Sequence, residues 1–368
     1  MPLTKLDVYG LRNLKSVQLS LSVGVNLFYG KNGSGKSSLL EAIFLLGRGR
    51  SFRSRLLTPV INNDESQCTV FGLQAHGGRD IPIGVTRTRQ GSGVFKINGQ
   101  PVTTASSLAE TLPLQLINQD AFNLLEGSPL YRRRFIDWGV FHVEQGYQQS
   151  FQKFQRTLKQ RNSLLRHDRM DEHILASWDR EYVDSAADMT QRRNRYLEDL
   201  LPIVKDVLAR LTAALPDVEY SLYPGWDEEK SLAVVLEADR RRDVQYKTTH
   251  HGPHRADLRI RYGKHPAAEV LSRGQLKILA IAMLIAQGFL FHARTGRHCI
   301  YLIDDLVAEL DLERRTHVAK LLIELGGQVI ITGVRKEDLV SLWPETETLK
   351  LFHVEQGQIA EERLNPGI

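Results

Sequence analysis

The chain has 368 residues, 42% of them hydrophobic and 25% charged, with a formal charge of +5. This composition is typical of soluble globular proteins, and the length allows one large or two ordinary domains. The mild positive charge permits an anionic partner without requiring one. Two distant cysteines, Cys68 and Cys299, argue against a disulfide scaffold and a structural zinc site, and the N-terminus lacks an apolar signal region. We therefore expect a cytoplasmic protein with no membrane partner.

The first part of the chain, to about residue 105, is predicted to be rich in strands. A short apolar segment at 25–29 predicts a buried strand, and residues 37–46 predict the helix after it. Further strands are predicted where polar and apolar residues alternate, at 3–9, 68–74, 81–88 and 94–97.

A complete G-x-x-x-x-G-K-S motif lies between that strand and that helix. In this pattern glycines let backbone N–H groups turn inward, the lysine reaches the β- and γ-phosphates, and the serine hydroxyl ligates Mg²⁺. The helix start adds its positive dipole end. The motif predicts a nucleotide site made by Gly30, Lys31, Asn32, Gly33, Ser34, Gly35, Lys36 and Ser37, with Ser38 following.

From about 130 to 215 the chain shows long helical periodicity. Phe151, Phe154, Leu158 and Leu165 share one predicted helical face, and basic residues occupy roughly the opposite arc. A second helix is predicted from about 174 to 200, and Pro202 is expected to open a third.

After about residue 250 the pattern returns to alternating helices and strands. A long apolar helix is predicted at 276–292, and we interpret it as buried because its apolar run, 278–290, is too short to span a bilayer. A strand at 299–303, a helix at 312–325 and a strand at 328–332 follow.

Two carboxylates, Asp304 and Asp305, end the apolar strand at 299–303. In a phosphate-loop fold the first acid is placed to hold Mg²⁺, and the second to orient or deprotonate an attacking water. The alternative is a solvated acidic turn. The presence of the phosphate loop favours the catalytic interpretation.

The segment Leu271-Ser272-Arg273-Gly274-Gln275 precedes the long apolar helix. Ser272 is predicted to cap that helix, whose N-terminus is a second potential anion site. Such a site can serve this chain's own nucleotide or that of another copy. An ordinary helix start is the alternative.

The order of these motifs resembles the head of ABC-type ATPases. The phosphate loop comes first, L-S-R-G-Q follows, and the acidic pair precedes Leu310-Asp311. Three positions depart from the family pattern: Arg273 replaces a glycine, Asp305 replaces a glutamate, and Thr332-Gly333 stands where a histidine is usual. The shorter Asp305 side chain suggests slow hydrolysis.

Further segments resemble the bacterial RecF family of recombination-repair proteins over nearly the whole chain. These segments are Leu11-Arg12-Asn13, the arginine-rich run 47–53, Arg132 to Asp137, and Gly252 to Leu258. The resemblance implies an α/β fold: a phosphate-loop, ABC-type ATPase core (lobe I, 1–110 and 255–368) with an inserted α-helical lobe II (111–254) that bears a short arm.

The resemblance also implies ATP and Mg²⁺ as cofactors and an ATP-dependent, head-to-tail homodimer. Lys36, Ser37 and Asp304 would bind ATP and Mg²⁺, and Asp305 would act as the base. Ser272, Arg273, Gly274 and Gln275 would complete the partner's site in trans. Further nucleotide contacts would come from Arg12, Asn13 and Thr332, and from Gln119 or Asp120 on a loop that reports the γ-phosphate.

DNA would be engaged at single-strand gaps, as duplex and as junctions of single and double strand. RecR, and through it RecA, would be the protein partners. The DNA contacts should be phosphate contacts, because the basic residues lack an aromatic ladder. The candidates are Arg48, Arg50 and Arg53, with Lys153, Arg156, Lys159 and Arg166 on the arm; for the last four, a solvated helix face is the alternative.

Other basic and histidine-rich segments are given structural roles. Arg132 to Arg134 are interpreted as internal ion-pair or lobe-contact residues, with DNA ligands as the alternative, and His254 to Asp257 as a hinge between lobes rather than a metal site. Two functional alternatives remain open: an energy-transducing ABC-type subunit of another assembly, and a scaffold in which nucleotide acts without appreciable catalysis.

Overall fold

A computed structural model describes residues 1–167, 171–212, 215, 217–343 and 348–363. The chain forms two compact units. Unit 1 comprises Met1–Ala121, Arg210–Thr212 and Phe291–Ile368, and unit 2 comprises Phe122–Ala209 and Ala213–Leu290. This grouping by contact differs from the two lobes expected from the sequence, chiefly by placing 255–290 in unit 2. The lobe boundaries stay a prediction.

An antiparallel sheet (sheet A) forms the first half of unit 1 and confirms the strands predicted from alternation. Its strands lie in the order β2-β1-β4-β5-β6-β7. Their bounds are β1 Leu3–Leu11, β2 Leu14–Ser20, β4 Gln67–His76, β5 Arg79–Thr88, β6 Gly93–Ile97 and β7 Gln100–Val102.

The second sheet of unit 1 (sheet B) places the nucleotide motifs. Its order is β15-β14-β3-β13-β12-β8, and every neighbouring pair is parallel except β14 and β15. The carboxyl ends of β3, β13 and β12 therefore meet at one edge, where ligands bind in open α/β sheets. The bounds are β3 Val25–Tyr29, β8 Leu114–Ile117, β12 Ile300–Ile303, β13 Val329–Gly333, β14 Leu349–Glu355 and β15 Gln358–Glu362.

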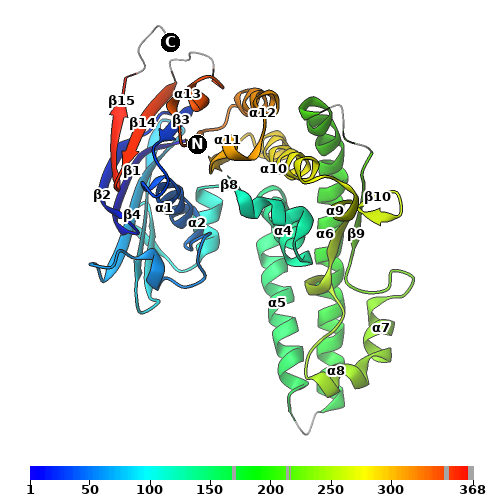
Figure 1. Cartoon of the computed structure of the whole chain (residues 1–368). Coiled ribbons are helices and arrows are strands. Elements are labelled where there is room, and N and C mark those ends of the chain that lie inside the picture. Colours follow the sequence, from blue (N-terminus) through cyan, green and yellow to red (C-terminus); the bar gives the residue numbers. More distant parts are fainter. Residues whose placement is uncertain (168–170, 213–214, 216, 344–347, 364–368) are drawn as a thin grey trace. The chain divides into compact units, whose positions relative to one another are not determined.

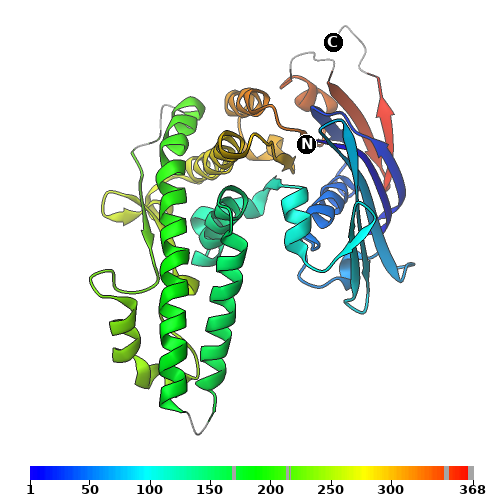
Figure 2. The same cartoon turned by 180° about the vertical axis from the view of Figure 1, so that it is seen from behind.

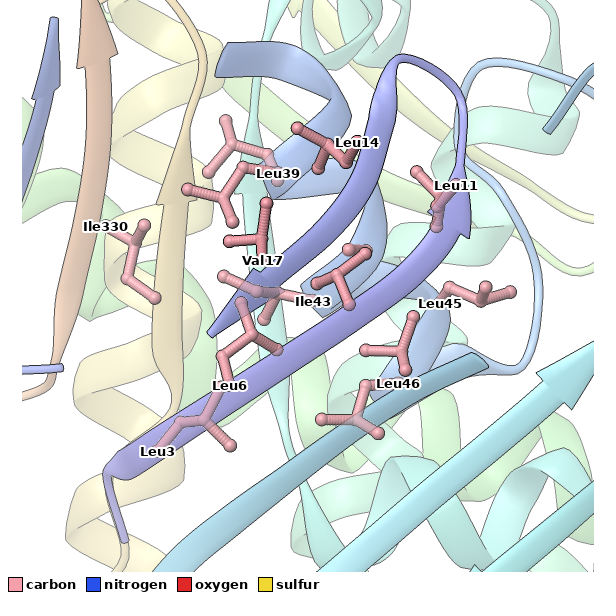
Figure 3. Close-up of a cluster of buried hydrophobic side chains, with 14 of the residues drawn as sticks. Leu3, Leu6, Leu11, Leu14, Val17, Leu39, Ile43, Leu45, Leu46 and Ile330 are labelled. Carbon is pink, nitrogen blue, oxygen red and sulfur yellow. The ribbon is translucent and has the colours of Figure 1, made fainter. Parts of the chain in front are cut away.

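Helix α1 (Lys36–Arg48) packs against strands of both sheets. Figure 3 shows its Leu39, Ile43 and Leu46 among side chains of β1, β2 and β13, including Leu6 and Ile330. Burying these large aliphatic groups fixes the helix, and with it the phosphate loop that leads into it. The remaining helices of unit 1 are η1 Thr58–Val60, α2 Ala105–Thr111, α11 Leu306–Glu309, α12 Leu312–Leu325 and α13 Lys336–Val340, with η2 Gln119–Phe122 at the unit boundary.

Unit 2 is mainly helical and carries a three-stranded sheet of order β11-β10-β9. Two helices, α5 and α6, run side by side and form the arm (Figures 1 and 2). The strands are β9 Glu219–Tyr223, β10 Asp257–Tyr262 and β11 His265–Pro266. The helices that lie wholly or mostly in this unit are α3 Asn123–Glu126, α4 Pro129–Val143, α5 Tyr147–Leu164, α6 Glu172–Leu211, α7 Leu232–Ala238, α8 Arg240–Tyr246, η3 Pro253–Arg255, α9 Ala267–Val270 and α10 Arg273–Thr295.

The prediction that Pro202 opens a new helix is wrong. Helix α6 is 40 residues long and continues through Pro202. A proline inside a helix removes one hydrogen bond and costs about 3 kcal/mol. Pro202 lies on the exposed side, while Leu200, Val204 and Val207 are buried around it. Continued burial of this apolar stripe offsets the lost bond.

The long apolar helix is longer than predicted. Helix α10 spans 23 residues and is long and apolar enough to cross a membrane by length and composition alone, which corrects the length argument made from the sequence. Its most apolar window is 72% buried inside the structure. The polar Gln287 in that window is also accommodated: its amide donates to the Phe135 carbonyl at 2.8 Å and to the Tyr196 hydroxyl at 2.9 Å. These observations confirm a buried core helix.

Candidate functional site

Three glycines of the phosphate loop, Gly30, Gly33 and Gly35, have the positive φ that favours glycine, and two of them show what it allows. Gly30 has φ +158°, and a Cβ there would lie 2.1 Å from the Val354 carbonyl oxygen. Gly33 has φ +79°, and a Cβ there would meet no described atom within 4 Å. Gly30 thus lets the loop lie against β14, while Gly33 leaves the space above the loop open.

Lys36 holds this loop together from the first turn of α1. Its ammonium donates to the carbonyl oxygens of Gly30, at 2.6 Å, and of Lys31, at 2.9 Å. Burial lowers the pKa of Lys36, and the carboxylates of Asp305 and Asp304 oppose that shift. The Lys36 amine is thereby held beside the loop on which the phosphates are expected.

Asp304 brings the second motif to the same edge of sheet B. Its Oδ1 accepts hydrogen bonds from the hydroxyls of Ser37, at 3.0 Å, and Thr332, at 2.7 Å. Ser37 and Asp304 are separated by 267 positions in the chain. The parallel pairing of β3, β13 and β12 brings them together.

Asp305 follows in a left-handed conformation with φ +52°, uncommon for any residue other than glycine. Its backbone N–H donates to the Thr332 hydroxyl at 3.1 Å. Thr332 was predicted to contact the nucleotide. In the structure its hydroxyl is hydrogen-bonded to the Asp304 carboxylate and to the Asp305 N–H.

Two hairpin turns brace the phosphate loop. From the turn between β1 and β2, the Asn13 amide donates to the Ser34 carbonyl at 3.1 Å and accepts from the Ser38 hydroxyl at 3.0 Å. From the turn between β14 and β15, the Gly357 N–H donates to the same Ser34 carbonyl at 2.8 Å. The loop is thereby held in place before any ligand binds.

The buried carboxylate of Glu41, in α1, forms ion pairs with two arginines beside the phosphate loop. Arg12 donates to it twice, each at 2.9 Å, and also to the Pro59 carbonyl. Ser51 donates to the same carboxylate, and the Arg53 guanidinium lies 3.7 Å from it. Arg53, predicted as a DNA ligand, is thus drawn toward the loop.

These groups surround one cavity of about 970 Å³ in unit 1. Gln119 and Glu309 face each other at its rim, with the amide donating to the carboxylate at 3.1 Å. Of the predicted residues, the lining includes Arg12, Asn13, Asn32, Gly33, Gly35, Lys36, Ser37, Ser38, Gln119, Asp120, Asp304 and Asp305, and also Arg53, which was predicted as a DNA ligand. Gly30, Lys31, Ser34 and Thr332 instead shape the loop or support the acids.

Sequence reasoning missed one wall of this cavity. Residues between α1 and β4 form it, and of the missed ones among them only Phe52 belongs to a segment singled out in the sequence, the run 47–53. The length of this connection was the available signal, because long connections are often functional. The missed lining residues are Phe52, Pro59, Ile61, Asn62, Asn63, Asp64, Asn118 and Glu309.

The chemistry of the cavity fits a phosphate group and a divalent cation. The Ser34 hydroxyl is buried and makes no hydrogen bond to any described residue, so it has capacity for a ligand. No group of three or more His, Cys, Asp or Glu able to hold a metal occurs within the described residues. Ser37 and Asp304 would hold a Mg²⁺ ion that takes its other oxygens from phosphate and water, as this ion commonly does.

The L-S-R-G-Q segment belongs to unit 2 and begins helix α10. The Ser272 hydroxyl accepts from the Gln275 N–H at 3.3 Å, and the Gln275 side chain accepts from the Ser272 N–H at 2.9 Å. This reciprocal pair is a capping box and confirms Ser272 as the cap. Ser272 and Arg273 are exposed, and Gly274 and Gln275 are half-buried.

The predicted DNA ligands differ in accessibility. Arg48 is half-buried, donates to the Leu114 carbonyl at 3.4 Å, and has its pKa lowered to about 10 by burial, so it is poorly placed to meet DNA. Arg50 is exposed. On the arm the basic residues occupy the exposed arc, as predicted, and Lys153 lies 3.7 Å from Glu181. The exposed arm residues are Lys153, Arg156, Lys159 and Arg166.

The segments given structural roles make internal contacts in unit 2. Arg132 forms a two-point ion pair with Asp257, at 2.7 and 3.2 Å, which confirms the ion-pair interpretation for this residue. His254 lies between the Tyr182 hydroxyl, at 3.2 Å from Nδ1, and the Thr249 carbonyl, to which Nε2 donates at 3.0 Å. Burial lowers the pKa of His254 to about 4.

Comparison with known proteins places these features in a family. The RecF/RecN/SMC N-terminal domain family matches residues 2–360. The DNA replication and repair protein RecF of Pseudomonas syringae pv. syringae is 48% identical over 363 residues, covering 98% of each chain. RecF of Azotobacter vinelandii is 49% identical over 362 residues, covering 98% of this chain and 99% of its own.

Solved structures agree with the sequence matches. The recombination mediator protein RecF with ATP, of the RecFOR pathway, has a TM-score of 0.86 at 26% identity, with 98% of each chain covered. An SMC head bound to the C-terminal winged-helix domain of ScpA has a TM-score of 0.61 at 18% identity, covers 100% of this chain and 98% of its own, and shares the fold alone. These matches confirm the predicted ABC-type ATPase head, and the chain belongs to the RecF family of DNA replication and repair proteins.

Proposed function

We propose that this chain is an ATP-dependent DNA-binding protein that acts in the cytoplasm in recombinational repair and at replication gaps. The observation that carries the proposal is the meeting of Lys36, Ser37 and Asp304 at one cavity, although distant parts of the chain supply them. RecF relatives named for DNA replication and repair, and a similar RecF solved with ATP, support it.

The chain's own residues have distinct roles in this proposal. Lys36 exchanges its loop carbonyl partners for phosphate oxygens, and Ser37 and Asp304 hold Mg²⁺, which screens the phosphate charge. Asp305 accepts the proton of an attacking water. Because its side chain is one methylene shorter than the usual glutamate, hydrolysis is slow. Gln119 reports the γ-phosphate through its bond to Glu309.

A second copy of the chain completes each site. The exposed N-terminus of α10, with Ser272, Arg273, Gly274 and Gln275, faces the partner's nucleotide in a head-to-tail dimer. Contacts made only when nucleotide is present favour the dimer, and hydrolysis of the ATP lets the two copies separate. ATP therefore times how long the dimer stays on DNA.

The dimer binds duplex DNA and junctions between single and double strand through phosphate contacts. Arg50 and the exposed basic arc of the arm, with Lys153, Arg156 and Lys159, are the proposed ligands. Such contacts release counterions, so affinity falls steeply with salt. Bound at a gap, the protein works with RecR to promote RecA loading.

The test is ATP hydrolysis and DNA binding by the wild-type protein, Lys36→Ala and Asp305→Asn. We expect slow, DNA-stimulated hydrolysis in the wild type, loss of both activities in Lys36→Ala, and ATP-dependent DNA binding without hydrolysis in Asp305→Asn. Loss of ATP binding in Asp305→Asn would contradict the role of this residue as the base. If the wild type bound DNA in response to ATP without hydrolysis, nucleotide would act only as a ligand of a scaffold.

A further inference from the structure

Thr332 is buried at the end of β13, the strand that separates the phosphate-loop strand β3 from β12. Its backbone pairs with Phe28 of β3, which fixes where its side chain stands relative to both neighbouring strands. Thr332-Gly333 stands where the ABC-type pattern has a histidine that senses the γ-phosphate. Thr332 lies instead against the acidic pair, which calls for a different role.

The Thr332 hydroxyl donates one hydrogen bond and accepts another. A threonine hydroxyl has a single proton, and Thr332 donates it to Asp304 Oδ1 at 2.7 Å. The lone pairs of the same hydroxyl accept the Asp305 N–H at 3.1 Å. One hydroxyl therefore bridges the two consecutive acids.

We propose that Thr332 is a positioning residue that sets both acids of the pair through this bridge. By fixing Asp304 Oδ1 together with Ser37, the hydroxyl determines the orientation of the carboxylate toward the cation site. By accepting the Asp305 N–H, it holds that residue in its left-handed conformation, φ +52°. The proposal rests on the proposed function, because the acids are positioned for Mg²⁺ and water at the ATP site.

Substitution by valine separates the hydroxyl from the shape of the side chain. Thr332→Val has nearly the same volume, removes the hydroxyl that accepts the Asp305 N–H, and removes one donor from Asp304. Thr332→Ser keeps the hydroxyl and serves as the rescue. Thr157→Val is the matched control, because Thr157 is equally buried in unit 2 and donates to the Phe154 carbonyl at 2.9 Å.

The experiment measures binding of a fluorescent ATP analogue, first in EDTA and then over a Mg²⁺ titration. We expect Thr332→Val to raise the Mg²⁺ concentration for half-maximal enhancement of binding about tenfold, equivalent to about 1.4 kcal/mol. Binding in EDTA should stay unchanged, and Thr332→Ser and Thr157→Val should behave like the wild type.

Three results would overturn the proposal. One is an unchanged Mg²⁺ dependence in Thr332→Val, and another is equal weakening with and without Mg²⁺, which indicates a general structural defect. The third is failure of Thr332→Ser to restore the wild-type titration. If the wild type bound no analogue under either condition, the proposed function itself would fail, and the role of Thr332 with it.

Discussion

Replacing His254 tests how the loop before β10 is fixed to the arm. The imidazole lies between Tyr182 and Thr249, and burial keeps its pKa at about 4, against an ordinary 6.5. Arg255 and Arg133 lower the pKa further, and Asp243 and the Thr249 carbonyl oppose the shift. Because the folded pKa is depressed, the neutral ring is the form compatible with folding.

The free energy of unfolding should therefore fall as the pH is lowered below the ordinary pKa of histidine. Above pH 6.5 the ring is neutral in both states, and His254 adds no pH dependence. Between about pH 6.5 and 4 the unfolded chain binds the proton first, so folding loses about 1.36 kcal/mol per pH unit, up to about 3 kcal/mol in all. From pH 7.5 to 5 the expected loss from this group is about 2 kcal/mol.

The assay is urea unfolding of the wild type and His254→Gln at pH 7.5 and 5, followed by intrinsic tryptophan fluorescence. The variant is expected to be less stable at pH 7.5, since it loses packing, but its stability should fall by about 2 kcal/mol less on acidification. His167→Gln, at an exposed histidine, is the control and should keep the wild-type slope. Equal slopes for the wild type and His254→Gln would refute the assignment.

Three further predictions concern the site and the core. Gly357→Ala should weaken ATP-analogue binding severalfold, because a Cβ there would lie 2.1 Å from the Asn13 carbonyl oxygen; Gly263→Ala, in another hairpin turn with open space around it, should leave binding unchanged. Equal effects of the two substitutions would rule out bracing of the loop. Asp304→Asn should abolish the enhancement of analogue binding by Mg²⁺ while binding in EDTA persists; retained enhancement would remove Asp304 from the cation site. Gly139→Ala should lower the melting temperature, since a Cβ would lie 1.9 Å from the Tyr196 hydroxyl and overpacking costs about 1–3 kcal/mol; an unchanged melting temperature would contradict this close packing.

Short-range patterns predicted the parts of the fold that depend on local chemistry. Strand β3 has the bounds 25–29 expected from its apolar run, and α12 has the expected bounds 312–325. The helix cap at Ser272 was likewise predicted, because the capping bond joins residues three apart in the chain. Such features need no knowledge of the rest of the chain.

Features that depend on distant contacts were not visible in the sequence. Strand β8 has only four residues and is stabilised by pairing with β12, so its own pattern gave no signal. The bracing of Ser34 by Gly357 joins segments more than 300 positions apart. The role of Thr332 depends on β13 lying beside β12, which parallel pairing decides and single-strand periodicity does not.

In the proposed dimer, ATP binds at the phosphate loop of one copy, and the N-terminus of α10 from the other copy completes that site. Light scattering of the purified protein, with and without ATP and Mg²⁺, tests this arrangement most directly. We predict a monomer that becomes a dimer only with ATP and Mg²⁺, and a Ser272→Arg variant that binds ATP but stays monomeric. A mass unaffected by ATP, or a Ser272→Arg protein that dimerises like the wild type, would contradict the shared site.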